Sequence, residues 1–212
     1  MGSIDYKKLY DLQDKILDIV FDVEDEFYLT GGTALSRFFY AKRYSDDLDF
    51  FTNNSQRYPY ALKNIISKLH DNFKLKYEIN SRDFARFKID SILQVDFVND
   101  RVLRYKEPNI LENGYKIDNI ENILTNKLTA VIGRDNPKDI FDIYLIDKYN
   151  IIDYQKMIQV AQEKMHFSKD DLIVRLKSFP VSLLNNIKLI DKTFLNDFEK
   201  EYKQIITKIE EA

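Results

Sequence analysis

Two short segments carry the residue types from which an active site is most readily built. Gly31 and Gly32 stand side by side, and further along the chain Asp47 and Asp49 flank an apolar Leu48. A glycine turn that opens a helix presents backbone N–H groups and a positive dipole end, which favour a bound anion such as phosphate. In a strand, the two carboxylates project from one face, where a divalent cation relieves their repulsion. An anion cradle followed by a metal-holding pair suggests phosphoryl or nucleotidyl transfer.

A third acid stands in the apolar segment that reads Leu93-Gln94-Val95-Asp96-Phe97. The alternation predicts a strand whose apolar side chains pack inward and whose Gln94 and Asp96 share the other face. Aspartate is disfavoured in strands, so a nearby metal is one reason for its presence. The alternative is an aspartate near a strand end that reaches solvent or an arginine. Asp90 competes for the role, but it fits a tight turn with Ser91 better.

Lys127 interrupts the apolar stripe of a predicted helix, four residues from both Ile123 and Val131. Lysine is almost never buried without a partner, and a triphosphate would be one. A carboxylate would serve equally, and a long lysine also extends its ammonium group to water. Asp139 and Asp142 share a face of the following helix, which either turns toward a metal site or braces Lys127.

The elements that must position these residues form an α+β pattern. A short strand precedes the glycine pair, and apolar periodicity elsewhere separates helices from strands. A capping box of Asp118 and Glu121 opens the helix that contains Lys127. Residues 99–117 read as irregular, and the chain after Ile151 contains only helices. We expect helices at 4–24, 33–40, 59–69, 119–132, 137–149, 154–166, 169–178, 181–190 and 192–212, and strands at 27–30, 45–51, 74–81, 84–90 and 92–98.

Composition narrows the possible functions. Cysteine is absent and there are two histidines, which excludes disulfides, thiol catalysis and zinc–thiolate sites and disfavours a histidine metal cluster. The hydrophobic share is 44%, enough for a packed core. A net charge of −3 does not mark a nucleic-acid binder, so any basic surface must be local. We expect a cytoplasmic protein without a membrane partner, because no apolar run approaches a membrane span and no signal peptide is visible.

Four segments in this order resemble the AbiEii/AbiGii-type nucleotidyltransferases, to which the mycobacterial MenT toxins are related. They read GGTALSR, RYSDDLDFF, LQVDF and NKLTAVIGRDNPKDIFDIYLI, and the resemblance runs from about Phe27 to Leu145. This family supplies the toxin halves of bacterial type IV toxin–antitoxin and phage-exclusion systems. The resemblance implies the DNA polymerase β-like nucleotidyltransferase fold. We expect a nucleotidyltransferase domain at residues 1–150 and a helical C-terminal region at 151–212.

The resemblance also implies roles for the residues around the glycine pair. Gly31, Gly32 and Thr33 would cradle the phosphates of the nucleotide, although the wider superfamily more often has Gly-Ser at this point. Ser45 would contact a phosphate or position the strand that follows it.

The remaining implied roles belong to the acids and the lysine. Asp47 and Asp49 would hold Mg²⁺, with two ions expected in all, and Asp96 would complete the metal site and activate the acceptor hydroxyl. Lys127 and Asp142 would match the essential lysine and aspartate of the family's last motif, and Lys127 would bind the triphosphate.

The expected reaction is the attack of an acceptor hydroxyl on the α-phosphate of an NTP, with release of pyrophosphate. The family makes RNA, and specifically a tRNA 3′ end, the expected acceptor, and it implies a cognate antitoxin that acts without a stable complex. One alternative is the same chemistry on a small molecule, as in antibiotic-modifying enzymes. Another is a non-catalytic module that binds NTP or a protein partner, against which the complete set of acids argues.

The helical tail is a candidate for acceptor recognition, because the nucleotide site is complete by Asp142. Its charges balance, so a uniformly basic clamp is excluded. We expect local cations to line the rim of an acceptor groove, and these are Lys164, Lys169, Arg175 and Lys177.

Overall fold

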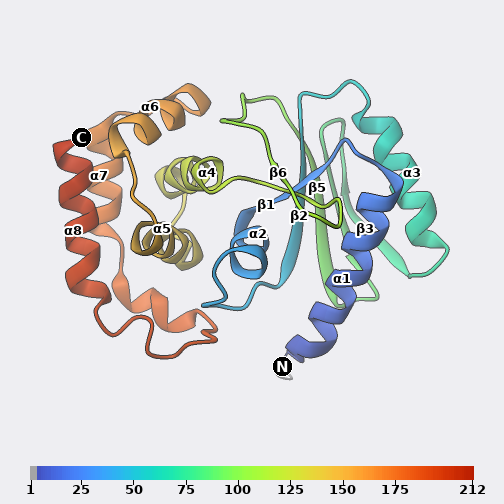
Figure 1. The fold of residues 1–212 in the computed structure, drawn as a ribbon, viewed down its shortest axis with the longest axis horizontal. Helices are drawn as coiled ribbons and strands as arrows, with labels where there is room; N and C mark the ends of the chain where they lie inside the picture. The colour runs from blue at the N-terminus through green and yellow to red at the C-terminus, as the bar shows by residue number, and fades with distance from the viewer. Residues whose placement is uncertain (1–3) are drawn as a thin grey trace. The chain divides into compact units, whose positions relative to one another are not determined.

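A seven-stranded mixed sheet is the framework of the first of two units in this computed structural model, which describes residues 4–212 (Figure 1). Unit 1 comprises the described residues up to Ala34 together with Ser45–Asp118, and unit 2 comprises Leu35–Tyr44 together with Asn119–Ala212. The strand order is β3-β4-β5-β2-β1-β7-β6. The bounds of the strands are Tyr28–Thr30 (β1), Asp47–Asn53 (β2), Leu75–Asn80 (β3), Phe84–Ile89 (β4), Leu93–Asp100 (β5), Asn109–Ile110 (β6) and Lys116–Ile117 (β7).

The core of unit 1 lies on the sheet face covered by α1 (Tyr6–Val23) and α3 (Tyr58–His70). The Phe50 and Phe97 rings stack with centroids 5.2 Å apart, and Phe27 meets Phe97 edge-on at 5.2 Å. The Tyr58 hydroxyl donates to the carbonyl of Phe97 at 2.9 Å, which satisfies a buried polar group. Burial of each such side chain contributes about 1.5–3 kcal/mol. Strict alternation in β2 and β4 turns the remaining side chains to the opposite face.

The hairpin between β4 and β5 fixes which residues of these strands lie opposite each other. Asp90 and Ser91 both have positive φ, 47° and 60°, as expected of the short polar residues that tolerate such turns. The amide of Ile92 donates to the carbonyl of Ile89 at 2.9 Å and closes the turn. The tight turn predicted at this point is therefore confirmed, and Asp90 acts there as a turn former.

Unit 2 is helical, and side-chain caps begin α4 (Ile120–Gly133), α5 (Pro137–Tyr149), α6 (Tyr154–Lys164) and α7 (Lys169–Ser178). Asn119, Asn136 and Asp153 each accept a hydrogen bond from an amide of the first turn that they precede, and Ser168 forms a complete capping box with Asp171. Helix α2 (Gly31–Phe38) runs from unit 1 into unit 2. The others are the 3₁₀ helix η1 (Val181–Asn186) and α8 (Phe198–Glu211).

Four expectations about local structure are wrong. Residues 99–117 contain β6 and β7, and β7 pairs with β1 in parallel. The helix expected at 181–190 is the shorter η1, and the last helix begins at Phe198 rather than near 192. Asn119, not Asp118, caps α4, because the Asp118 carboxylate accepts a hydrogen bond from the Thr30 hydroxyl instead.

The two units do not coincide with the predicted segments 1–150 and 151–212. Those segments rest on the change to helices alone after Ile151 and on the extent of the family resemblance, and their assignment stays a prediction. Within residues 4–212, no helix combines the length and the apolar character needed to cross a membrane.

Candidate active site

Polar residues line up across four strands of unit 1, and we call this set the carboxylate row: Thr30, Asp49, Asp96 and Arg86. Asp49 on β2 pairs in register with Asp96 on the parallel strand β5. Arg86 on β4 lies opposite Asp96, and Thr30 on β1 lies opposite Asp49. Neighbouring strands are about 4.8 Å apart, so the two carboxylates share one face at close quarters. The buried Leu48 and the aromatic core occupy the other face.

Arg86 holds Asp96 with both arms of its guanidinium group. Nε lies 2.8 Å from Oδ1 and Nη2 lies 2.6 Å from Oδ2, while the Asp96 side chain is 8% exposed and that of Arg86 32%. The hydrogen bond to Asp96 and the negative charges of Asp96 and Asp49 hold the pKa of Arg86 above its usual value. An aspartate that reaches an arginine was one of the two explanations open for Asp96.

Arg86 is a residue that sequence reasoning did not single out. The signal was present, because a turn at Asp90 and Ser91 between two alternating strands places Arg86 within one residue of the position opposite Asp96. A search for a basic partner across the predicted hairpin would have found it.

Gly31 is required at the start of α2 for two reasons. Its φ of +71° lies in the left-handed region that glycine adopts without strain. A Cβ atom at this position would lie 2.6 Å from Oδ2 of Asp49, closer than such atoms approach. The glycine therefore brings backbone against the first carboxylate of the row. With Gly32 and Thr33 it forms the first turn of α2, whose amides have no partner inside the helix.

Thr33 and Ser45 are buried and tie the glycine turn to β2. The Thr33 hydroxyl lies 2.8 Å from Oγ of Ser45 and donates to the main-chain carbonyl of Asp47. Ser45 is also tied to α1, because Gln13 Nε2 donates to its carbonyl at 3.1 Å. These contacts give both hydroxyl groups a structural task. Their predicted contact with nucleotide phosphates stays a prediction.

The donor set of the row has the chemistry of a magnesium site that is shared with a substrate. Asp47, Asp49 and Asp96 lie on two adjacent strands, but within the described part of the chain no three acidic or imidazole side chains gather closely enough to enclose a metal. Mg²⁺ usually takes one or two carboxylates and completes its shell with water and substrate phosphates. The in-register pair of Asp49 and Asp96 fits that requirement, and the three-acid metal site stays a prediction.

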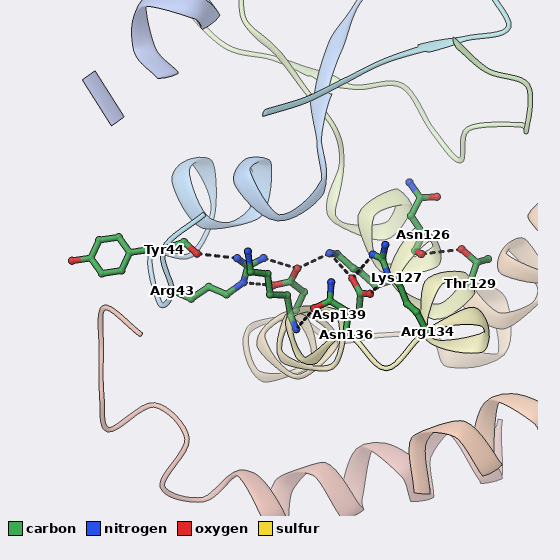
Figure 2. Close-up of polar contacts among 10 residues, drawn as sticks. Arg43, Tyr44, Asn126, Lys127, Thr129, Arg134, Asn136 and Asp139 are labelled. Atoms are coloured by element: carbon green, nitrogen blue, oxygen red, sulfur yellow. Dashed lines mark hydrogen bonds and ion pairs between the residues drawn. The ribbon is translucent and has the colours of Figure 1, made fainter. Parts of the chain in front are cut away.

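A second set of charges lies in unit 2, and we call it the buried ion cluster: the buried Arg43, Lys127, Asp139 and Asp142, with Arg134, whose side chain is 58% exposed, at its edge (Figure 2). Arg43 Nε and Nη2 each lie 2.8 Å from an oxygen of Asp142. Lys127 Nζ lies 2.8 Å from Asp142 Oδ2 and 2.9 Å from Asp139 Oδ1. Arg134 Nε lies 2.7 Å from Oδ2 of Asp139, at the other end of this series of ion pairs.

The charges of this cluster stabilise each other against the cost of burial. Burial disfavours the charged form of Asp142, but Arg43 and Lys127 outweigh it and hold the pKa of Asp142 below its ordinary value. Burial likewise disfavours the ammonium form of Lys127, but Asp142 and Asp139 outweigh it and raise the pKa of Lys127. A carboxylate was one of the partners considered for Lys127 from the sequence, and the lysine contacts two carboxylates. The contact with Asp139 agrees with the interpretation that Asp139 and Asp142 brace Lys127.

Arg43 is the second residue that sequence reasoning missed. Its side chain is 1% exposed, although it stands in the polar-looking segment Lys42-Arg43-Tyr44. No periodicity marks one arginine of a loop as buried, so the sequence offered no signal for this contact. The structure therefore divides the predicted residues into two groups. Lys127 and Asp142 belong to unit 2, and the others, Gly31, Gly32, Thr33, Ser45, Asp47, Asp49 and Asp96, belong to unit 1.

The four tail cations proposed for an acceptor rim all have partners within unit 2. Lys164 donates to the side-chain oxygens of Asn122 and Asn126, and Arg175 binds the carbonyl of Val131. Lys169 and Lys177 contact Glu210. These contacts tie tail helices to α4 and α8, and a role in acceptor binding stays a prediction.

Comparisons with known proteins agree on the fold. JHP933 from Helicobacter pylori aligns with a TM-score of 0.62 and 21% identity, over 99% of this chain and 92% of its own. The nucleotidyltransferase toxin MenT4 from Mycobacterium tuberculosis aligns with a TM-score of 0.65 and 12% identity, over 98% and 85%. At these identities the likeness shows the fold alone, and the expected α+β, DNA polymerase β-like nucleotidyltransferase fold is confirmed.

Sequence comparison extends beyond the fold. An uncharacterized protein of Aquifex aeolicus is 27% identical over 159 residues, which are 71% of this chain and 72% of that protein. The sequence pattern of the family described as nucleotidyl transferase AbiEii toxin, Type IV TA system, matches residues 16–212. The match includes the helical tail, which the resemblance read from the sequence did not cover. The pattern matches far more than half of this chain, which therefore belongs to the AbiEii family of nucleotidyltransferase toxins of type IV toxin–antitoxin systems.

Proposed function

We propose that this nucleotidyltransferase uses Mg²⁺ and an NTP, and that its acceptor is a hydroxyl group of RNA, with the 3′ end of a tRNA as the specific expectation. The observation that carries the proposal is the in-register pair of Asp49 and Asp96 beside the start of α2. Gly31 brings backbone against Asp49 there, as a site for a metal-bound phosphate requires. The RNA acceptor rests on family membership.

In the proposed reaction, an oxygen of the acceptor hydroxyl forms a bond to the α-phosphorus of the NTP. The bond from that phosphorus to the bridging oxygen breaks, and pyrophosphate leaves with the bonding electrons. Asp96 is the acid proposed to accept the proton of the attacking hydroxyl, and Asp47 and Asp49 supply the remaining metal-binding oxygens. Mg²⁺ in such sites neutralises charge on the attacking and leaving oxygens.

The roles proposed for the remaining residues follow from the family. Gly31, Gly32 and Thr33 present the amides of the first turn of α2 to the phosphates. Lys127 is proposed to favour the triphosphate, and Asp142 keeps that lysine charged. The buried ion cluster contains three cations and two carboxylates, so its net field favours an anion.

The test is transfer of label from each of the four α-³²P-labelled NTPs to total RNA in the presence of Mg²⁺. We expect one or two nucleotides to label a discrete RNA band that RNase removes, and EDTA to abolish the labelling. Asp49→Asn should reduce transfer by at least about a hundredfold, as expected when transition-state charge loses its stabilisation.

Asp46→Asn is the matched control for this assay. It removes the same charge from a neighbouring residue whose carboxylate accepts a hydrogen bond from Tyr6, which an asparagine oxygen also accepts. We expect this variant to keep normal activity. Full activity of Asp49→Asn would exclude the metal role, and label confined to a small RNase-resistant product would exclude RNA in favour of a small-molecule acceptor.

The toxin role has a separate test in cells. Expression of the wild-type protein should arrest growth, whereas Asp49→Asn should not, because the arrest requires transfer. A cognate antitoxin should restore growth without forming a complex that co-purifies with the toxin. A toxic Asp49→Asn variant would contradict the proposal that nucleotidyl transfer causes the arrest.

A further inference from the structure

The carboxylate row contains an ion pair in which both arms of one guanidinium group bind one carboxylate. Arg86 binds both oxygens of Asp96, the acid proposed to complete the metal site. In-register pairing with Asp49 on one side and Arg86 on the other places Asp96 between a like charge and an opposite charge. Without a metal, two adjacent carboxylates repel each other, and the guanidinium group is the counter-charge that the fold provides.

We propose that Arg86 competes with the divalent cation for Asp96, so that metal binding requires this ion pair to open. The inference rests on the proposed function, because it takes the carboxylate row as the metal site. Each oxygen of Asp96 already accepts a charge-assisted hydrogen bond, which uses the lone pairs that point toward β4. A metal bound through both oxygens would have to replace the guanidinium group. A metal bound through one remaining lone pair would lie within a few ångströms of a fixed positive charge.

Arg86 is the partner able to move. Asp96 is 8% exposed and lies in the middle of the sheet, so its carboxylate is held in place. The side chain of Arg86 is 32% exposed, and its guanidinium carbon lies 5.4 Å from the centre of the Phe84 ring on the same strand. Glu78 on β3 contributes to the negative field that Arg86 experiences. A displaced guanidinium group therefore has a second carboxylate toward which it can turn.

Competition makes an unusual prediction, because removal of a residue at the site should strengthen metal binding. Arg86→Met keeps most of the apolar stem and removes the charge. We expect it to bind Mn²⁺ on the order of tenfold more tightly than the wild type, since one repelling charge is lost at short range. Arg86→Lys keeps the charge but loses the two-armed geometry, so its affinity should lie between the two.

Lys88→Met is the matched control. Lys88 lies two residues away on the same face of β4, opposite Gln94, and has no ion-pair partner within the described residues. The Lys88→Met substitution removes one positive charge from the same surface as Arg86→Met. A general change in the electrostatic field at the metal site would therefore appear in both variants. We expect its affinity for Mn²⁺ to stay within about twofold of the wild type because the charge is farther away and screened.

The measurement is titration of EDTA-treated protein with Mn²⁺ near pH 8 at constant ionic strength, followed by the electron paramagnetic resonance signal of the free ion. Thermal unfolding of the same samples reports folding independently of activity. Without metal, Arg86→Met should melt at a lower temperature than the wild type, and saturating Mn²⁺ should raise its melting temperature by the larger amount.

The outcomes separate this inference from the proposed function. Equal or weaker binding by folded Arg86→Met would overturn the competition and leave the metal site standing. Absence of Mn²⁺ binding by the wild type and all variants would overturn both. If Arg86→Met does not fold, the Arg86→Lys variant decides the question, because affinity equal to or weaker than that of the wild type contradicts competition.

Discussion

The carboxylate row of unit 1 and the buried ion cluster of unit 2 use the same residue types in opposite proportions. In the row, Asp49 and Asp96 outnumber Arg86, and the side chain of Asp49 is partly exposed. In the cluster, three cations outnumber Asp139 and Asp142, both of which are fully buried. The row combines the partly exposed carboxylate of Asp49 with the buried one of Asp96, whereas each cation of the cluster contacts a fully buried carboxylate.

This difference assigns the two sets different physical tasks. A buried charge is tolerated only when it is paired, and the removal of one partner leaves an uncompensated charge. The cluster is therefore sensitive to the loss of any central member. Asp49 and Arg86 of the row are partly exposed, so the excess negative charge there costs less than it would in a closed interior and attracts a cation. Asp→Asn substitutions in the two sets should consequently change stability in opposite directions.

Asp142→Asn should produce the largest effect. Asp142 accepts three charge-assisted contacts, from two nitrogens of Arg43 and from Lys127. The asparagine amide would place a donor against donors, leave Arg43 without its carboxylate partner and leave Lys127 with Asp139 alone. We expect a loss of about 3–5 kcal/mol in the free energy of unfolding, measured by urea denaturation. A loss below about 1 kcal/mol would show that the cluster is far more hydrated than its burial indicates.

The pH dependence of stability sharpens the same point. The pKa of Asp142 is lowered in the folded state, so its contribution is complete above the unfolded value of about 3.9 and is lost as the pH falls through the lower folded value. The difference in unfolding free energy between wild type and Asp142→Asn should therefore shrink as the pH falls below about 4. The raised pKa of Lys127 acts oppositely, because its contribution is present below about 10.4 and is lost as the pH rises through the higher folded value.

The two sets also differ in how far the sequence revealed them. Alternation around Asp49 and Asp96 predicted both strands and the shared face, because a period of two is visible in a single segment. The contact of Lys127 with carboxylates was one of several open alternatives. Arg43 was not predictable, because its partner lies 99 residues away and loop positions have no periodicity. Local patterns identify elements, whereas long-range ion pairs depend on how loops close, which one sequence does not specify.

Lys127→Met should have the next largest effect and tests whether the cluster does more than hold the fold. Asp142 keeps Arg43 and Asp139 keeps Arg134, so we expect a loss of about 1–3 kcal/mol, less than for Asp142→Asn. If the lysine also favours the triphosphate, NTP affinity should fall while Mn²⁺ affinity stays unchanged. Equilibrium dialysis with labelled NTP measures the NTP affinity.

The control for this variant is Lys156→Met, which removes a charge from an exposed position of α6. It should change neither stability nor NTP affinity beyond about 0.5 kcal/mol. Unchanged NTP binding by a folded Lys127→Met variant would restrict Lys127 to its structural contacts.

Asp49→Asn should have the smallest effect on stability, and its sign is the informative quantity. Asp49 lies beside Asp96 in register, and Arg86 directs both guanidinium bonds to Asp96. Removal of one of two neighbouring negative charges relieves repulsion, although it also removes the attraction of Arg86 for Asp49. At a partly exposed surface these opposing changes amount to less than about 1 kcal/mol, and we expect a small net gain without metal.

Saturating Mn²⁺ should reverse the order of stability of wild type and Asp49→Asn, because the wild type then gains binding energy that the variant lacks. Thermal unfolding in EDTA and in Mn²⁺ measures both signs. If Asp49→Asn were instead as destabilising as Asp142→Asn in the metal-free protein, the contrast between an open carboxylate row and a closed ion cluster would be wrong.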